Sequence, residues 1–457
     1  MHNSALSNAA RRRFIAGAAG LSATRALPLG GALLAAANAA HAVGDHKALV
    51  CVNLSGGNDQ SNTVVPMGAG EYAAYAAARP TLALPHDQLL ALQPAGYGGQ
   101  PLGLHPSLAA IKPLFDRGRM ALLANVGPLA QPMTKAQWNN GAPTVPVPFQ
   151  LTSHSDQTGA WQTGLPDKPS ATGWFGRIGD LTAGTYNVGS GVSIAMSVAG
   201  NNALQAGDST IQYQLTTQGA VKVQALNDLY GSAAGATALR RLMTDSRSHL
   251  FENEMAKISA RAIASEAVVS SALAGVSLSV PFPNTALGRQ LQIVAKMIGA
   301  RSALAQRRQL FFVQQGGYDF HDNLLNDQAR LLRELAEALA AFNAAIDALG
   351  VAQSVTAFTT SEFGRALQHN GRGSDHGWGG HHFIMGGAVL GNRVYGTFPT
   401  VALGGPEDSG QGRLIPSTAV DEYAATLARW FGVADGNMAS VVPNIGRFAR
   451  RNLGFLA

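Results

Sequence analysis

Two stretches of this sequence are apolar at almost every position, and they limit the possible fold more than any other feature. Residues 48–54 form the first stretch and run directly into Ser55-Gly56-Gly57, and residues 120–126 form the second. A continuous apolar run of this length is typical of a strand that is buried on both faces, as in a parallel sheet. The loop that follows such a strand is where α/β proteins bind their ligands.

Helix-like and strand-like segments alternate along the rest of the chain. The pattern predicts helices at residues 106–115, 221–229, 237–274, 285–306, 327–349 and 420–431, and strands at residues 310–313, 355–359 and 383–385. This alternation predicts an α/β fold with a mostly parallel sheet flanked by helices. No linker-like boundary divides residues 43–457, so we expect one large domain. The polar stretch 128–172 is too long for a simple connection and is expected to pack near the functional site.

The positive charge of the chain is concentrated at its start. The chain has 33 basic and 27 acidic residues, and residues 1–42 contain four arginines and no acid. The other 415 residues therefore carry 29 basic and 27 acidic side chains, which is close to neutral. We expect no nucleic-acid partner, because polyanion binding requires a basic surface.

The first 42 residues have the organisation of a signal peptide. A basic segment ends in the twin arginines of residues 11–15, a mild apolar stretch follows, and residues 40–42 match an A-x-A cleavage site. A membrane anchor is the alternative, but Arg25 and Pro28 interrupt the apolar run. We therefore expect the twin-arginine export machinery as a partner, a periplasmic or secreted location, and no stable membrane span after cleavage.

Acidic and imidazole side chains gather after the predicted strands. These candidate metal ligands are Asp59, Asp319, His321, Glu362, Asp375, His376 and His381. The carboxyl ends of strands in an open α/β sheet share one ligand-binding edge, and a mixture of Asp and His suits zinc, manganese or iron better than calcium. Each residue also has a purely structural explanation: Asp59 as a turn former, Glu362 in a salt bridge with Arg365, and His381 in a solvated loop.

A second candidate group lies at residues 151–157. Ser153 is a possible nucleophile at the start of a helix, and His154 a possible ligand or general acid/base. The alternative is that Ser153 only caps the helix. No G-x-S-x-G, Walker or H-E-x-x-H motif occurs in the chain.

Several segments together resemble a known family. They are the twin-arginine leader and residues 53–59, 62–66, 104–106, 153–157, 161–164, 173–177, 317–321, 361–365 and 370–381. In this order they resemble an exported bacterial family catalogued as domain of unknown function 1501, which looks like a branch of the alkaline phosphatase and sulfatase superfamily. That likeness implies a three-layer α/β/α sandwich with metals at the carboxyl edge of the sheet.

The resemblance also implies roles for individual residues. Asp59 would be the ligand after the first strand, and Asp319, His321 and His376 would hold one metal. Glu362 would stand where the superfamily has a metal-binding Asp followed by His. Phe363 replaces that His, so a second metal site is short of a ligand.

The residues and the resemblance together lead to one expected function and one alternative. The expected function is an exported hydrolase of phosphate or sulfate esters, on a small molecule or a polymer, that uses one or two divalent ions, zinc or manganese foremost. Ser153 would attack the ester, and Arg365 would help to stabilise the developing negative charge. The alternative is an exported scaffold or binding protein that has this fold without catalysis.

Overall fold

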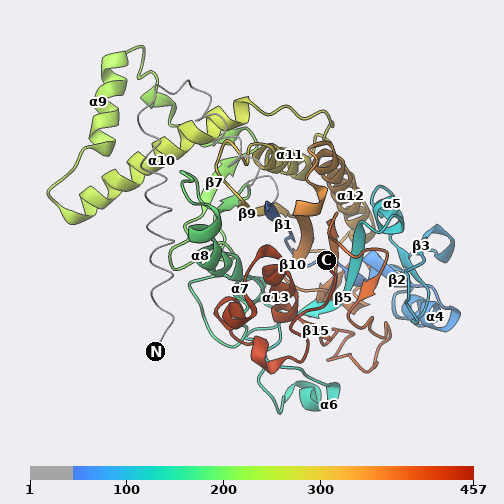
Figure 1. The fold of residues 1–457 in the computed structure, drawn as a ribbon. Coiled ribbons are helices and arrows are strands. Elements are labelled where there is room, and N and C mark those ends of the chain that lie inside the picture. Colours follow the sequence, from blue (N-terminus) through green and yellow to red (C-terminus); the bar gives the residue numbers. More distant parts are fainter. Residues whose placement is uncertain (1–44) are drawn as a thin grey trace, which may run out of the picture. The chain divides into compact units, whose positions relative to one another are not determined.

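The apolar run at residues 48–54 lies at the centre of the fold, in strand β1 (Lys47–Leu54). The computed structural model describes residues 45–457, so the predicted signal peptide lies outside the described residues. β1 pairs in parallel with β9 (Arg308–Gln315) on one side and with β10 (Val355–Ser361) on the other (Figure 1). The prediction of a buried parallel strand is confirmed, because every residue of β1 from Ala48 onward is buried.

These strands belong to a ten-stranded sheet with the order β14-β5-β13-β10-β1-β9-β6-β7-β8, in which β15 also pairs with β5. The other strands are β5 (Met120–Gly127), β6 (Ala195–Ser197), β7 (Tyr213–Thr216), β8 (Gly219–Ala220), β13 (Gly380–Gly386), β14 (Val394–Tyr395) and β15 (Thr418–Ala419). β13 is antiparallel to both its neighbours, and β8 is antiparallel to β7. All other pairings in the sheet are parallel, which confirms the predicted mostly parallel sheet.

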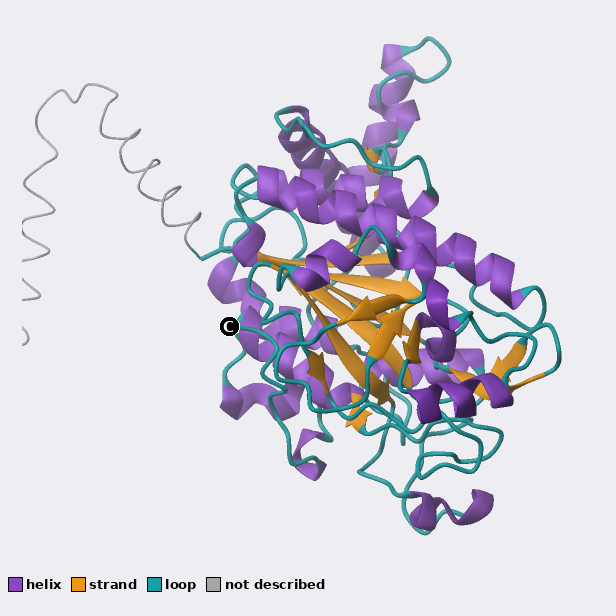
Figure 2. Cartoon of the chain, turned by 90° about the vertical axis from the view of Figure 1, so that its right-hand side faces the viewer, coloured by secondary structure: helices purple, strands orange, loops and turns teal. Residues whose placement is uncertain are grey.

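The alternation of side chains along β1 builds two separate hydrophobic layers. Ala48, Val50 and Val52 face a layer that includes α11 (Ala286–Gly299) and α12 (Leu324–Ala348). The intervening side chains face a second layer formed with α8 (Trp174–Tyr186), α13 (Val420–Phe431) and α14 (Met438–Val441). Figure 2 shows the strands enclosed between helices. The fold is therefore an α/β/α sandwich, as expected, and Cys51 is a buried free thiol in its core.

Three helix predictions differ from the structure. Residues 221–229 contain only the short 3-10 turn η4 (Gln224–Leu226), and residues 106–115 divide into η2 (Pro106–Leu108) and α5 (Lys112–Asp116). Pro113 lies in the first turn of α5, where its missing N–H is tolerated. The long alanine-rich stretch divides into α9 (Ala233–Thr244) and α10 (Leu250–Ala274). The Asn253 side chain in the first turn of α10 accepts hydrogen bonds from Ser246 and Arg247 in the loop between the two helices, which stabilises the break.

The remaining elements are short and lie mostly around the edge of the sheet. They are α3 (Gln60–Thr63), α4 (Ala69–Ala78), α6 (Lys135–Trp138), α7 (His154–Thr163), β2 (Val64–Pro66), β3 (Leu90–Leu92), β4 (Leu102–Leu104), β11 (Arg365–His369), β12 (Ser374–His376), η1 (His86–Gln88), η3 (Asn139–Gly141), η5 (Ala352–Ser354), η6 (Asp435–Asn437) and η7 (Ile445–Arg447). β2, β4 and β3 form a small sheet, and β11 pairs with β12. Within residues 45–457, no helix is both long and apolar enough to cross a membrane.

The register of the three central strands determines which loops meet. Leu54, the last residue of β1, is aligned with Gln315 at the end of β9 and with Ser361 at the end of β10. The loops that follow these strands therefore leave the sheet side by side at its carboxyl edge. The polar segment 128–172 contributes α6 and α7, and the first residue of α7 reaches this edge.

Candidate metal centre

Asp319 is the centre of a group of polar side chains at the carboxyl edge of the sheet. It lies in the loop after β9, and its side chain is 44% exposed. Asp319 Oδ1 lies 3.1 Å from His321 Nε2 and 3.2 Å from His376 Nε2. The two imidazole Nε2 atoms are themselves 2.9 Å apart.

These three distances fit a shared metal ion. Ligand atoms bonded to one ion at ~2.1 Å lie about 3.0–3.4 Å apart in octahedral or tetrahedral geometry. Asp319, His321 and His376 meet this requirement almost without adjustment. A carboxylate oxygen and two imidazole nitrogens form a donor set that suits zinc and manganese.

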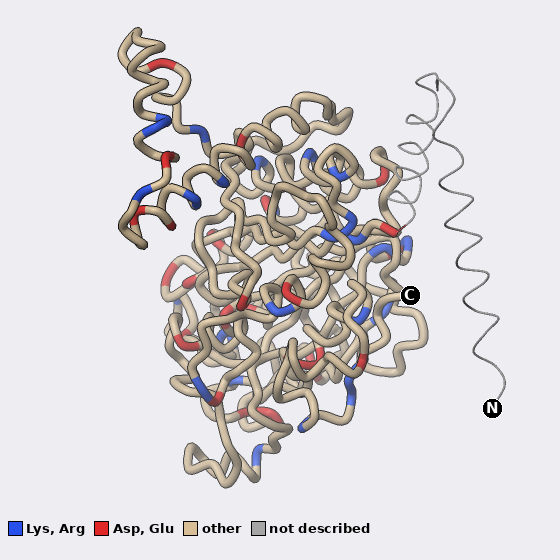
Figure 3. Tube along the Cα trace, turned by 60° about the vertical axis from the view of Figure 1, so that its left-hand side comes forward, with Lys and Arg blue, Asp and Glu red and all other residues tan. Residues whose placement is uncertain are grey.

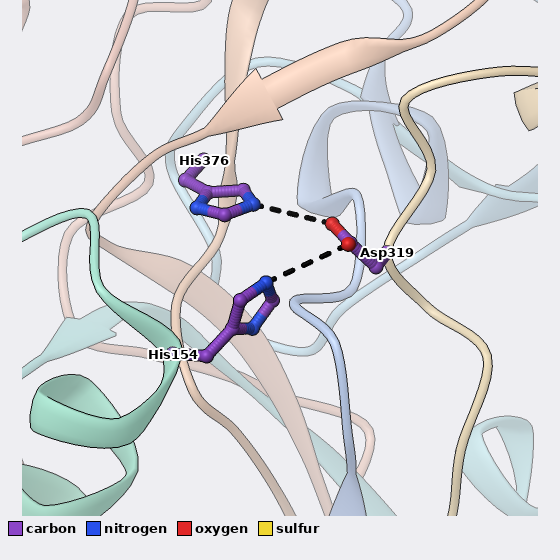
Figure 4. A group of neighbouring side chains, drawn as sticks. All are labelled: His154, Asp319 and His376. Carbon is purple, nitrogen blue, oxygen red and sulfur yellow. Dashed lines mark hydrogen bonds and ion pairs between the residues drawn. The ribbon is translucent and has the colours of Figure 1, made fainter.

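His154 approaches the same carboxylate from α7 (Figure 4). Its Nε2 lies 3.6 Å from Asp319 Oδ2. One ligand atom from each of His154, Asp319 and His376 lies within 4.8 Å of the others. Four side chains from three separate segments therefore converge on one point.

Each of the three histidines has an acceptor at its other nitrogen. His154 Nδ1 donates to Glu362 Oε2, and His376 Nδ1 donates to the Thr152 carbonyl at 2.7 Å. His321 Nδ1 faces Asp375 Oδ1 at 3.4 Å. An acceptor at Nδ1 holds the ring proton on that nitrogen and leaves the Nε2 lone pair free to bind a metal. Metal-binding histidines usually have such a hydrogen-bond acceptor at the nitrogen that does not bind the metal.

Glu362 is held in place by the loop after β1. Its Oε1 accepts from Ser55 Oγ and from the Gly56 N–H, each at 3.0 Å. Gly56 has φ +114°, and a Cβ there would lie 2.5 Å from the Asp319 backbone nitrogen. Only glycine permits this close approach of the two loops. Glu362 is thus buried, and its carboxylate contacts His154 and the loop after β1 in place of the metal position that was predicted for it.

Arg365 lies behind Asp319 and is fully buried. Its guanidinium donates to Asp319 Oδ1 at 3.0 Å, to the Gly56 carbonyl at 2.9 Å and to the Ser374 carbonyl at 2.8 Å. Partial burial by itself raises the pKa of Asp319, but the hydrogen bond and charge of Arg365 outweigh it and lower the pKa, so the carboxylate is ionised.

The formal charges of the group match a divalent cation. Asp319, Glu362 and Asp375 carry one negative charge each, and Arg365 offsets one of them. Burial, helped by the charge of Arg365, lowers the pKa of His376 and keeps that imidazole neutral. The formal charges of these three carboxylates and Arg365 sum to −2, which a doubly charged ion would neutralise.

Two predicted ligands make their contacts elsewhere. Asp59 is completely buried, forms an ion pair with Arg79 and caps α3 by accepting from the Ser61 N–H at 3.2 Å. His381 is buried in β13, where its Nδ1 accepts from the Asn125 N–H at 3.1 Å. Burial lowers the pKa of His381 to about 3.

Ser153 is placed next to the group, but its hydroxyl is engaged as a helix cap. Ser153 Oγ accepts from the Asp156 N–H of α7 and donates to Asp156 Oδ2 at 2.6 Å.

Two groups that contact the predicted site residues were not predicted from the sequence. Arg79, the partner of Asp59, belongs to no recognisable motif. The Thr152 carbonyl was missed because a backbone acceptor leaves no signal in residue identity.

The fold and the site define an α/β protein with a candidate divalent-metal centre at the carboxyl edge of its sheet. The chain belongs to the family described as Protein of unknown function (DUF1501), whose model matches residues 46–443. The predicted family membership is therefore confirmed.

Similarity to solved structures is low in sequence and moderate in coverage. The PsFucS1 sulfatase from Pseudoalteromonas sp. is 11% identical, with a TM-score of 0.35, over 88% of this chain and 72% of that chain. Ps i-CgsB is 9% identical, with a TM-score of 0.37, over 89% and 77%. A mutant of the alkaline phosphatase PafA is 13% identical, with a TM-score of 0.27, over 69% and 63%. No curated protein sequence matches this chain. These values transfer no activity to it.

Proposed function

We propose that this chain is an exported metal-dependent hydrolase of phosphate or sulfate esters. The observation that carries the proposal is the convergence of three imidazole Nε2 atoms on Asp319, each with an acceptor at its Nδ1. Asp319, His321 and His376 would hold a zinc or manganese ion, with His154 at its side. When bound, the ion would supply Lewis-acid polarisation of the ester oxygen.

His154 is suited to move a proton. Glu362 holds its Nδ1–H, so the lone pair on Nε2 points toward Asp319 and is free to accept a proton from an attacking hydroxyl or water. Glu362 then stabilises the imidazolium, as the buried carboxylate does in other acid–histidine pairs. The His154 side chain is 41% exposed, so an ester can reach it from solvent.

Ser153 remains the proposed nucleophile. It precedes His154 directly, but its hydroxyl must leave Asp156 before it can attack. Arg365 acts through Asp319 in this structure, since its donors are used by that carboxylate and by backbone carbonyls. The residues of the signal peptide, 1–42, would bring the folded protein to the periplasm or beyond.

The test combines metal analysis with a panel of aryl phosphates and aryl sulfates. The purified protein should contain about one zinc or manganese ion per chain, and it should hydrolyse at least one of the two ester classes. Asp319→Ala should lose both the metal and the turnover. Asp322→Ala is the matched control, because Asp322 lies in the same loop but pairs with Arg372 at 2.7 Å. Turnover that survives in Asp319→Ala would refute the proposal.

One observation favours an exported binding protein as the second candidate. The Phe363 ring is 1% exposed, stacks on His376 with centroids 4.6 Å apart and packs against Gly57. Phe363 has no atom that can bind a metal, and it occupies the position at which the family resemblance implies a further metal-binding His. Bound metal without turnover of any ester in the panel would support this second function.

A further inference from the structure

Helices α9 and α10 form an arm that stands away from the sheet (Figures 1 and 3). We define the helical arm as residues 233–262. The main contacts of α9 are with α10 and with η4. Toward its C-terminal end α10 packs on the rest of the protein, where Ser265 Oγ donates to the Gly191 carbonyl at 2.8 Å and Val269 is buried. Side chains of both charges are distributed over the arm (Figure 3).

The helical arm exposes an unusual amount of apolar surface. Of the fifteen large hydrophobic side chains exposed within residues 45–457, five lie between residues 242 and 258: Leu242, Leu250, Phe251, Met255 and Ile258. Scattered exposed hydrophobic residues are normal, but a contiguous group of them marks an interaction surface.

Part of this surface has the spacing of a helix-pairing seam. Phe251, Met255, Ile258 and Ala262 follow one another at intervals of four, three and four residues, which are the a and d positions of a heptad. We call these four residues the α10 stripe. Phe251 is 77% exposed, Met255 62% and Ile258 51%. Ala256 is buried and lies on a different side of the helix, so the side of α10 that packs is not the side of the stripe.

We propose that the α10 stripe pairs with the same stripe of a second copy of this chain, in an antiparallel and two-fold symmetric contact. In this arrangement Met255 lies opposite the partner's Ile258, and Phe251 lies opposite the partner's Ala262. The largest side chain of the stripe therefore meets the smallest one, as interdigitating helices require. A two-fold contact uses the same patch on both copies, so no second complementary surface is needed.

The charges beside the stripe fit the antiparallel orientation. Glu254 and Arg261 lie on the same flank of the stripe, one heptad apart. The antiparallel contact places Glu254 against the partner's Arg261, and the two-fold axis produces this pair twice. A parallel contact would instead place Glu254 against the partner's Ser259, and this ion pair would not form. Glu252 and Glu254 are balanced by Lys257 and Arg261 in this part of α10, so the stretch lacks the basic excess with which a helix binds an anionic membrane.

The fold leaves room for this contact. Each α10 joins its own body after residue 262, and Glu266 pairs with Lys222 there at 3.7 Å. Because the partner helix runs in the opposite direction, its body lies beyond the free end of the first arm. The stripe spans twelve residues, or about 17 Å from its first Cα to its last along the helix, which separates the two bodies.

The test is the mass of the purified protein in solution, measured by analytical ultracentrifugation over a range of concentrations. We expect a concentration-dependent dimer. Ile258→Glu should weaken dimerisation at least ~100-fold, because it buries a charge in the contact. Ile211→Glu is the matched control, since Ile211 is 72% exposed and lies outside the arm. Circular dichroism checks that both variants fold.

A charge exchange tests the orientation. Glu254→Arg should weaken the dimer about tenfold by placing two arginines together, and the double variant Glu254→Arg with Arg261→Glu should restore it. A monomer at every concentration, or a dimer unaffected by Ile258→Glu, would overturn the proposal. Binding to vesicles of phosphatidylcholine and phosphatidylserine that Ile258→Glu abolishes, without a dimer, would assign the stripe to a membrane surface instead.

Discussion

Asp59 and Asp319 follow neighbouring parallel strands at the same edge of the sheet, and each contacts an arginine, yet their surroundings differ. Asp59 and Arg79 are both fully buried, whereas Asp319 is 44% exposed and also faces three histidines. The buried pair has no access to solvent or substrate, so its role is structural. The exposed carboxylate keeps ligand capacity, which makes it available for chemistry.

The histidines show the same contrast over a short distance in sequence. His376 lies at the edge with its Nε2 toward Asp319, but His381 and His382 are buried within β13. Burial lowers the pKa of both buried histidines to about 3, and His382 packs edge-on against Trp161. The number of histidines in a segment therefore does not identify ligands, whereas access to the carboxyl edge does.

The largest expected effect separates the two kinds of histidine. His376→Gln should remove a metal ligand and abolish ester turnover. Loss of a residue that only hydrogen-bonds a ligand costs ~10–100-fold in metal affinity, so loss of the ligand itself should cost more. His381→Gln should retain the metal and lower stability by about 1–3 kcal/mol, because the Asn125 N–H loses its buried acceptor. Metal content and turnover measured on both variants test this. Metal loss in His381→Gln alone would reverse our assignment of the two positions.

Breaking the buried ion pair should cost stability but leave the metal in place. Arg79→Met leaves Asp59 charged and buried and should lower the free energy of unfolding by about 3–5 kcal/mol. The control is Arg330→Met, whose exposed pairs should contribute at most about 1 kcal/mol. Urea unfolding measures both variants. Equal costs would show that the pair at Asp59 is hydrated.

The buried histidines should make stability depend on pH. Their pKa is lowered from 6.5 to about 3, so the unfolded chain binds the extra protons. The stability they contribute is present above pH 6.5 and is lost as the pH falls toward 3. At pH 5 each histidine should already have lowered the free energy of unfolding by about 2 kcal/mol. Buried Asp421, with a pKa raised to about 8, acts in the opposite direction.

Variants isolate the histidine contribution from that of Asp421. The free energy of unfolding should fall less between pH 7 and pH 5 in His382→Phe than in the unaltered protein. His249 is exposed, so His249→Gln should show the same fall as the unaltered protein. Urea unfolding of metal-free protein at both pH values provides the measurement. An unchanged pH dependence in His382→Phe would mean that water reaches this histidine.

The smallest expected effect concerns Ser153. If its hydroxyl only caps α7, Ser153→Ala should cost about 1 kcal/mol and leave turnover intact, as Thr285→Ala should at the start of α11. If Ser153 is the nucleophile, the same variant should lose turnover while metal content is preserved. Turnover and urea unfolding of the two variants distinguish these outcomes.

The sheet was predictable from sequence because strands buried on both faces are apolar throughout. The runs at residues 48–54 and 120–126 became β1 and β5, and the segments at residues 310–313 and 355–359 became β9 and β10. The prediction of a helix at 221–229 was wrong, because a short apolar segment has too little periodicity to separate a helix from a turn. The resemblance to the family rested on motifs at the strand ends and was confirmed.

The sequence by itself determined which residue types stand at the ends of the strands, and with them the α/β class and the candidate ligands. Only the tertiary structure decided that Asp319, His321 and His376 meet while Asp59 turns to Arg79. It also decided that His154 joins them from α7, whose position depends on contacts more than 200 residues apart in the chain. The physical reason is that residue identity sets what a side chain can bind, whereas burial and distance set what it does bind.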